Sequence, residues 1–223
     1  MVLLAFTASV AFRQGLIPPQ LSPLPLIDLA RPDGWFIDWR LSELKTEREL
    51  CNRALRAPFI EAQAVVDQPL ADGCGWRNAV KVTSLSGAKL STDKLSCQSA
   101  AGLALWVAHD VQPLARQLLG SPVIAIRQFG TYSCRNVMGS PMFKHWRSAH
   151  ATANAIDIAA FTLADGRQIT VKKDWKTAGR EAEFLKAIGK HACRYFHVAI
   201  GPDYNAAHHD HFHFDRGIGH ACR

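Results

Sequence analysis

A histidine-rich stretch near the end of the chain, residues 208–215, constrains the fold more than any other feature. Its sequence is His-His-Asp-His-Phe-His-Phe-Asp, so four of its first six residues carry an imidazole. Alternate residues of a β-strand share a face, so Phe212 and Phe214 are expected to enter a core while the other face lines a cleft. That other face comprises His209, His211, His213 and Asp215. The stretch predicts a strand that is anchored on one side and can bind a metal on the other.

A second stretch, from Ser148 to Asp157, holds further residues with metal-binding chemistry. A zinc site needs neutral nitrogen or anionic oxygen donors that are held tetrahedrally on rigid elements. We therefore expect the two stretches to meet in space, with His150, Asp157 and His213 as the ligands of Zn²⁺. Three protein ligands leave one position for a water whose pKa falls to about 7, so hydrolysis at neutral pH is the expected chemistry.

Proton transfer at such a site needs a carboxylate or an imidazole beside the water. Asp210 and His211 are the two candidates. In a regular strand Asp210 lies on the far face, but it can swing towards the metal from a loop if strand pairing begins only at His211. The pattern assigns no role to His208 or His209.

Length and charge limit the classes of partner. A chain of 223 residues can bury one sizeable core. Its 26 Lys and Arg residues outnumber 19 Asp and Glu residues, so the formal net charge is +7 and the sequence pI is about 9.3. Such a surplus suits a cell-wall polymer, an anionic membrane surface or nucleic acid. The basic residues are scattered without a run of five, which argues against a nucleic-acid partner.

Six cysteines are widely spaced and form no Cys-x-x-Cys pair, which argues against a zinc knuckle or a redox motif. Their even number favours three disulfides, which persist in oxidising compartments such as the periplasm. Six buried thiols in a cytosolic protein are the alternative. Pairing of sequence neighbours is the simplest expectation, and it joins Cys51 with Cys74, Cys97 with Cys134, and Cys193 with Cys222.

Residues 1–40 are expected to form an appendage to a folded domain at residues 41–223. The segment from Met1 to Phe12 is uncharged and mostly apolar, and it is shorter than the roughly 20 apolar residues that span a bilayer. It is either the remnant of an export signal or membrane anchor, or an ordinary apolar helix. Five prolines from Pro18 to Pro32 predict an extended linker.

Hydrophobic periodicity predicts an α+β domain with a mainly antiparallel sheet flanked by helices. The expected strands are 79–83, 123–129, 155–161, 168–171, 195–200 and 211–214, and the expected helices are about 42–55, 99–119 and 178–193. Asp165-Gly166 makes a tight turn between two of these strands. Pro113 should kink or split the longest helix, on which Trp106 is interpreted as a core residue.

Several of these segments, taken in order, resemble the extensin-like protein C-terminal family. The resemblance covers roughly Leu41 to Arg223. It is carried by Cys97, Trp106 to Pro113, Gly130 to Arg135, Ser148 to Asp157, Phe161, Asp165 to Arg167, Trp175, and His208 to Asp215. The family is similar to the zinc peptidases grouped with D-alanyl-D-alanine carboxypeptidases, murein endopeptidases and the hedgehog signalling domain. The resemblance therefore implies a hedgehog/D-Ala-D-Ala peptidase-like fold.

The resemblance also implies roles for single residues. The implied zinc ligands are again His150, Asp157 and His213. An Asp-x-x-His form of the motif points to Asp210 for proton transfer, whereas a His-x-His form points to His211. Arg135 matches an arginine that could bind a substrate carboxylate or a developing oxyanion. Ser148 matches a serine that contacts substrate or orients the histidine that follows it.

The function implied is zinc-dependent hydrolysis of a peptide amide bond in bacterial peptidoglycan, by a carboxypeptidase or an endopeptidase that uses a zinc-activated water. The implied location is the periplasm or cell envelope, and the N-terminal segment could attach the protein to the inner membrane. The proline-rich linker would then let the domain reach the wall.

Two departures from the family pattern favour a second hypothesis. The pattern reads Ser-Glu-His with a glycine three residues after the histidine, and this chain has Ala149 and Ala153 at those positions. A non-catalytic module that keeps zinc and binds the cell wall or another partner is therefore the alternative. A nucleic-acid hydrolase would rest only on the basic charge and the histidine cluster.

Overall fold

The structure is a computed structural model that describes residues 11, 21, 26–31, 36–139 and 141–223. Most of the expected N-terminal export segment and most of the proline-rich linker lie outside the described residues. Within residues 26–31, Ile27 and Leu29 are buried in the hydrophobic core, and the carbonyl of Leu29 lies 3.0 Å from Nε2 of His109. The last part of the expected linker therefore packs on the domain, because its apolar side chains are buried there.

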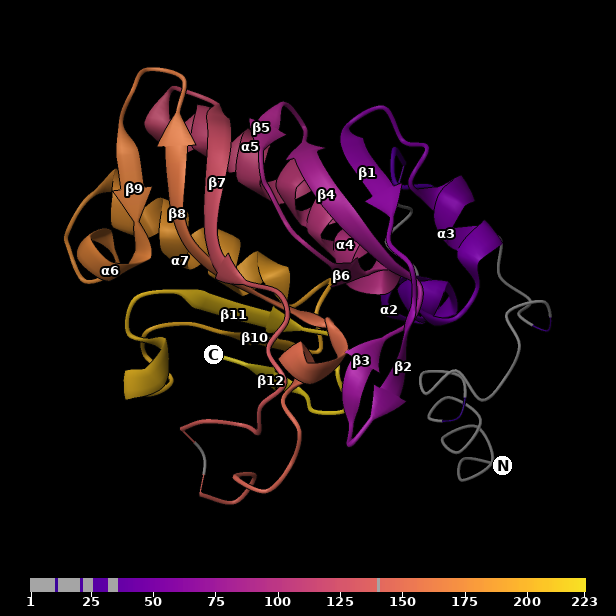
Figure 1. The fold of residues 1–223 in the computed structure, drawn as a ribbon. Helices are drawn as coiled ribbons and strands as arrows, with labels where there is room; N and C mark the ends of the chain where they lie inside the picture. Colours follow the sequence, from indigo (N-terminus) through magenta and orange to yellow (C-terminus); the bar gives the residue numbers. More distant parts are fainter. Residues whose placement is uncertain (1–10, 12–20, 22–25, 32–35, 140) are drawn as a thin grey trace, which may run out of the picture.

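A mixed, mostly antiparallel sheet runs through the described part of the chain (Figure 1). Its strand order is β1-β4-β5-β7-β8-β11-β10-β12, with β6 beside β4 and β9 beside β8. Only the pairs β5–β7 and β10–β12 among these are parallel. The strands are β1 (Ile60–Ala64), β4 (Ala79–Leu85), β5 (Ala88–Lys89), β6 (Leu95–Ser96), β7 (Val123–Gly130), β8 (Ala155–Leu163), β9 (Gln168–Thr170), β10 (Val198–Ile200), β11 (Phe212–Asp215) and β12 (Ala221–Cys222). A separate hairpin joins β2 (Gln68–Ala71) and β3 (Cys74–Trp76).

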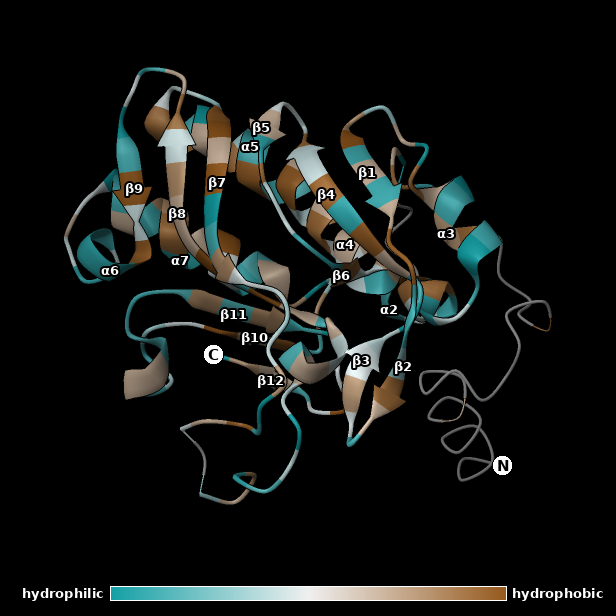
Figure 2. Cartoon of the chain, in the orientation of Figure 1, coloured by the Kyte–Doolittle hydropathy of each residue, from teal (hydrophilic) through white to brown (hydrophobic). Residues whose placement is uncertain are grey.

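Helices cover one face of this sheet, where α4, α5 and α7 lie behind the strands in Figure 1. The helical elements are α2 (Ile37–Ser42), η2 (Glu43–Lys45), α3 (Arg48–Ala54), α4 (Cys97–Trp106), η3 (Val107–Val111), α5 (Gln112–Leu114), η4 (Ala115–Leu119), η5 (Ala149–Thr152), α6 (Val171–Asp174), α7 (Arg180–Ala192) and η6 (Ala206–His208). Figure 2 shows hydrophobic and hydrophilic residues alternating along β4, as expected of a strand with one buried face, whereas β7 is hydrophobic over its first four residues. No helix among the described residues has the length and apolarity needed to cross a membrane.

The predicted elements are confirmed in type and approximate position. The antiparallel hairpin of β8 and β9 turns at Asp165-Gly166 as expected. The helix predicted at 42–55 is instead broken, because Glu47 adopts an extended backbone conformation (φ −95°, ψ 107°) between η2 and α3. The long helix runs from α4 through η4, with one π-helical segment before Pro113 and one after it. Proline cannot donate its backbone hydrogen bond, and a local change of helical pitch accommodates that loss.

The core lies between the sheet and the helices and is centred on Trp106, which is fully buried. Its ring packs at 5.1 Å from Phe214 and 6.2 Å from Phe161, and its Nε1 donates to the carbonyl of Ile188. The prediction that Trp106 is a core residue is confirmed. Because Phe214 belongs to β11, the core anchors the strand that carries the histidines.

Three disulfides join the six cysteines, which confirms the expected number. The pairs are Cys51–Cys97, Cys74–Cys134 and Cys193–Cys222. The pairing of sequence neighbours was correct only for the last pair and wrong for the other two. Packing of α3 against α4 brings together Cys51 and Cys97, which are 46 residues apart. Cys74 and Cys134 are 60 residues apart, and they meet because β3 packs against η5, whose His150 carbonyl accepts the N–H of Ser133.

Candidate metal centre

Two neighbouring strands present a carboxylate and an imidazole to each other. β8 and β11 pair antiparallel, and Asp157 lies directly opposite His213 in their register. Residues opposite each other in such a pair project from the same face of the sheet. Phe212 and Phe214 are buried on the other face, as the alternation predicted. Strand pairing therefore places Asp157 and His213 side by side on the histidine face of β11.

The third residue, His150, comes from the loop that precedes β8. Ser148 caps the short turn η5, and its Oγ accepts a hydrogen bond from the backbone N–H of His150 at 3.3 Å. The turn ends at Ala153, whose φ of 52° lies in the left-handed region. An alanine there costs about 1–2 kcal/mol relative to right-handed backbone. A glycine at this position would relieve that strain.

Asn154 fixes the end of this loop to the start of α4. Its Oδ1 accepts hydrogen bonds from Ser96 Oγ at 2.6 Å, Ser99 Oγ at 2.9 Å and Gln98 Nε2 at 3.1 Å. The backbone N–H of Ser96 also donates to the carbonyl of Ala153 at 2.7 Å. These buried bonds hold the loop, and so His150, against the rigid helix.

The three side chains converge to distances that suit a zinc ion. His150 Nε2 lies 3.2 Å from both Asp157 Oδ1 and His213 Nδ1, and His213 Nδ1 lies 2.9 Å from Asp157 Oδ1. Tetrahedral ligands with zinc bonds of about 2.0 Å stand about 3.3 Å apart. Two imidazoles and one carboxylate also form a donor set typical of catalytic zinc. The residues present therefore fit Zn²⁺, and only small outward movements are needed to admit it.

Burial and hydrogen bonding give the cluster a balanced charge. Burial would raise the pKa of Asp157, but hydrogen bonds and charges from His150 and His213 hold that pKa well below its ordinary value. Burial would lower the pKa of His213, but Asp157 and Asp215 raise it to about 9. A carboxylate and a proton-bearing imidazole thus occupy the site in its metal-free form, and a divalent cation would displace the proton.

Asp215 is a functional candidate that the sequence argument placed on the correct face without giving it a role. Its Oδ2 lies 2.9 Å from His213 Nε2, and its Oδ1 accepts the backbone N–H of Gly217 at 2.8 Å. A carboxylate here requires hydrogen on Nε2, which leaves the lone pair of Nδ1 pointing at His150 and Asp157. The signal in the sequence was the His-x-Asp spacing, which puts both residues on one strand face.

His211 and Asp210 act as a connected pair. Asp210 Oδ1 accepts a hydrogen bond from His211 Nδ1 at 2.9 Å, and His211 Nε2 lies 3.7 Å from Asp157 Oδ1. The imidazole therefore faces the cluster while the carboxylate stands behind it. Although burial opposes the effect, the hydrogen bond from His211 keeps the pKa of Asp210 below its ordinary value. Phe129 packs edge-on against the His211 ring at 5.7 Å and limits its movement.

His208 and His209 occupy different surroundings. Burial, together with the charges of the neighbouring His213 and His211, lowers the pKa of His208 to about 4, and its Nδ1 lies 2.7 Å from Asn205 Oδ1. His209 was expected on the cleft face but instead follows the turn η6 and is 60% exposed. The strand begins only at Phe212, so the period-two pattern does not reach back to His209.

Arg135 and Ser148 have defined contacts near the site. Arg135 Nη1 donates to the carbonyl of Asn136 at 3.3 Å. Ser148 is buried, and its Oγ is engaged with the backbone of His150. This geometry favours an orienting role for Ser148 over contact with a substrate.

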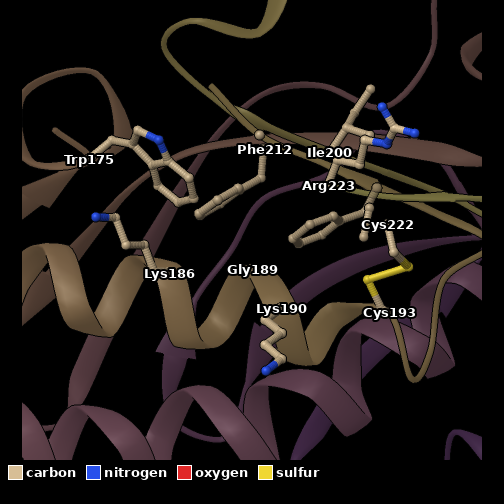
Figure 3. A pocket seen from close by; sticks show the side chains of 12 residues that line it. Trp175, Lys186, Gly189, Lys190, Cys193, Ile200, Phe212, Cys222 and Arg223 are labelled. Atoms are coloured by element: carbon tan, nitrogen blue, oxygen red, sulfur yellow. A yellow bond between two sulfur atoms is a disulfide. The ribbon is translucent and has the colours of Figure 1, made fainter. Parts of the chain in front are cut away.

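A cavity of about 470 Å³ lies on the opposite side of β11, between that strand and α7 (Figure 3). Trp175, Phe212 and the Cys193–Cys222 disulfide line it. Phe212 and Phe214 are also among its lining residues, although they are only 1% and 0% exposed. Three basic residues, Lys186, Lys190 and Arg223, also line it, but its lining includes no Asp, Glu or His. The side chains suited to metal binding and proton transfer lie instead on the histidine face of β11.

Comparison with known families finds one match, to the model described as extensin-like protein C-terminus, over residues 49–223. The match includes every residue of the cluster and all three disulfides. Comparisons with curated proteins and with solved structures find no match.

Proposed function

The chain belongs to the extensin-like protein C-terminus family, and on that basis we propose that it is a zinc-dependent hydrolase of a peptide amide bond in bacterial peptidoglycan. Both carboxypeptidase and endopeptidase action fit this proposal. The observation that carries it is the convergence of His150, Asp157 and His213, whose donor atoms all lie within 4.8 Å of one another. The finer likeness to the fold of hedgehog and D-Ala-D-Ala peptidases is part of the same proposal.

The three residues would hold zinc through His150 Nε2, a carboxylate oxygen of Asp157 and His213 Nδ1. Zinc in such a site supplies a Lewis acid and makes water nucleophilic at neutral pH. The chain itself supplies a rigid donor set, because Asp215 fixes the ring of His213 and Ser148 fixes the backbone of His150.

His211 is the residue best placed to move a proton. Its Nε2 faces the cluster, and Asp210 holds the hydrogen on its Nδ1, so Nε2 carries a free lone pair. In this scheme Nε2 accepts a proton from the attacking water and returns it to the leaving amine. Asp210 orients His211 through this hydrogen bond. Arg135 would bind the substrate carboxylate or the developing oxyanion.

Three features support an envelope location, which we propose as the periplasm or the cell envelope. The disulfides suit an oxidising compartment. The net charge of +7 suits an acidic wall polymer. The uncharged and mostly apolar residues 1–12 resemble the apolar part of an export signal or membrane anchor.

The proposal is tested by incubating the purified protein with muropeptides in the presence and absence of a chelator, and following amide cleavage by mass spectrometry. Cleavage should stop with the chelator and return with zinc. His150→Ala should abolish both zinc binding and cleavage, whereas His220→Ala, which alters an exposed histidine, should change neither. His211→Ala should keep zinc and lose most cleavage. A zinc-loaded wild type that cleaves no muropeptide would refute the hydrolase.

A non-catalytic zinc module that binds the cell wall or another partner is the second candidate. It is favoured by Ala149, which leaves no carboxylate at the position where the family pattern has glutamate. In that case Asp210→Ala and His211→Ala should leave binding to insoluble peptidoglycan unchanged, and no variant should show cleavage. Any hydrolysis that depends on His211 would exclude this alternative.

A further inference from the structure

A loop beside the candidate metal centre exposes an unusual set of side chains. We call residues 135–139 and 141–147 the Trp146 loop; it follows β7 and leads directly into Ser148 and η5. In Figure 1 it extends away from the sheet below β11 and β12. Asn205 Nδ2 donates to the carbonyl of Gly139 at 3.3 Å, so the loop also contacts the segment that precedes the histidines.

The loop presents four large apolar side chains to solvent. Met138, Met142, Phe143 and Trp146 are 61%, 79%, 41% and 59% exposed. Single exposed apolar residues are ordinary on a protein surface, but a concentration of them marks an interaction site. Phe143 and Trp146 pack edge to face at 5.6 Å, which brings their rings into one patch.

The two ends of the loop are fastened to each other and to the neighbouring hairpin. Val137 N–H donates to the carbonyl of Trp146 at 2.9 Å, and Ser148 N–H donates to that of Arg135 at 3.0 Å. Arg147 Nε donates to the carbonyl of Asp72 at 2.8 Å, and the Cys74–Cys134 disulfide closes the same region. These bonds hold Trp146 at the base of the loop, next to η5.

Positive charge surrounds this patch. The loop carries Arg135, Lys144 and Arg147, and the whole span of residues 111–156 contains no Asp or Glu. The acidic residue that contacts the loop, Asp72, does so through its backbone carbonyl. The charge of Arg147 is thus not neutralised by its hydrogen-bond partners, which are that carbonyl and the side-chain amide oxygen of Asn136.

We propose that the Trp146 loop binds the surface of an anionic lipid membrane. Aromatic and methionine side chains gain by leaving water for the acyl boundary, and Lys and Arg gain by meeting anionic headgroups. Tryptophan in particular favours the interface between lipid and water. A purely charged polymer would be served by the basic residues but would not reward exposed Met142 and Phe143. Binding through this loop would hold η5 and the cluster of His150, Asp157 and His213 near the membrane surface.

The test uses the full chain and sedimentation with vesicles, either of phosphatidylcholine alone or of equal parts phosphatidylcholine and phosphatidylglycerol. The wild type should bind the anionic vesicles at least tenfold more tightly. The double variant Met142→Glu/Phe143→Glu should lose at least tenfold of this affinity. The matched control is Ile124→Glu/Ile218→Glu, which makes the same charge change at residues 43% and 77% exposed and should stay within twofold of wild type.

Several results would overturn the proposal. The first is that the wild type does not bind anionic vesicles, and the second is that the Met142→Glu/Phe143→Glu variant binds them as tightly as the wild type. The third is that the Ile124→Glu/Ile218→Glu control loses as much affinity as the loop variant, which would indicate an effect of net charge alone. Binding to insoluble peptidoglycan without binding to vesicles would assign the loop to the wall instead. Zinc content and muropeptide cleavage should be unchanged in the loop variant, so failure of the proposed hydrolase would be seen separately.

A second measurement covers the case in which the loop variant fails to fold. Brominated lipids should quench part of the wild-type tryptophan fluorescence, and Trp146→Phe should remove that quenched part. Quenching that persists in Trp146→Phe, or that never occurs in the wild type, would contradict insertion of the loop.

Discussion

Replacing Asp215 with asparagine should weaken zinc binding by roughly 10- to 100-fold, which is the usual cost of losing a carboxylate behind a ligating histidine. Asp215 accepts from two donors, His213 Nε2 at 2.9 Å and Gly217 N–H at 2.8 Å. Asparagine has only one acceptor oxygen. If the asparagine NH₂ group faces His213, it donates to Nε2 and drives the ring hydrogen onto Nδ1. If the NH₂ group instead faces Gly217, two donors face each other and the backbone N–H of Gly217 loses its acceptor.

The loss corresponds to about 1.4–2.7 kcal/mol of binding free energy, since each tenfold change is worth about 1.4 kcal/mol. The metal-free protein should lose a similar amount of folding free energy, because a hydrogen bond to a charged group contributes about 1.5–3 kcal/mol. The two effects can be separated, because only the first depends on zinc concentration.

Competition with a chelator of known affinity measures the zinc dissociation constant, and ¹⁵N chemical shifts of the imidazole report which nitrogen carries hydrogen. Asp203→Asn, at an exposed aspartate, is the control for loss of one negative charge and should bind zinc as the wild type does. A folded Asp215→Asn variant with a dissociation constant within twofold of wild type would refute the orienting role of Asp215.

Three further predictions concern pH and the disulfides. Zinc binding at pH 7 should release close to one proton, because the pKa of His213 in the metal-free site is raised to about 9. Calorimetry in buffers of different ionisation enthalpy measures the number of protons released. A release of zero protons would contradict this prediction. In the metal-free protein the same shift stabilises the fold fully below pH 6.5, and the free energy of unfolding should fall as the pH rises through about 9. The double variant Cys74→Ala/Cys134→Ala should lower the free energy of unfolding by about 4 kcal/mol, because the disulfide closes a loop across a sequence separation of 60 and so restricts the unfolded chain. Denaturant titration measures this loss. A loss under 1 kcal/mol would show that the unfolded chain is already restrained there.

The residues that face the core could be predicted because they follow from local periodicity. Phe212 and Phe214 alternate with His213, and period two alone assigns each to a face. Trp106 was predictable for the same kind of reason, since it lies on a helix of almost continuous apolar character. Such patterns are local, and burial confirms them.

Features that depend on distant pairing could not be read in the same way. The partners of Cys51 and Cys74 depend on how α3 and β3 pack, which no spacing records. The relation of Asp210 to His211 depends on where β11 begins, and the turn η6 moves that start to Phe212. Residue type indicated His150, Asp157 and His213 as metal-type donors, but their closeness depends on the register of β8 with β11.

The register of β8 with β11 determines both the candidate site and the packing of the core, so the two form together or not at all. A slip of β11 by one residue would send Phe212 and Phe214 into water and His213 into the apolar layer around Trp106. A chain with incomplete core packing would therefore have no partial site to fill. Zinc uptake should then report correct assembly of the sheet, and a metal-binding assay would double as a quality control for folded protein.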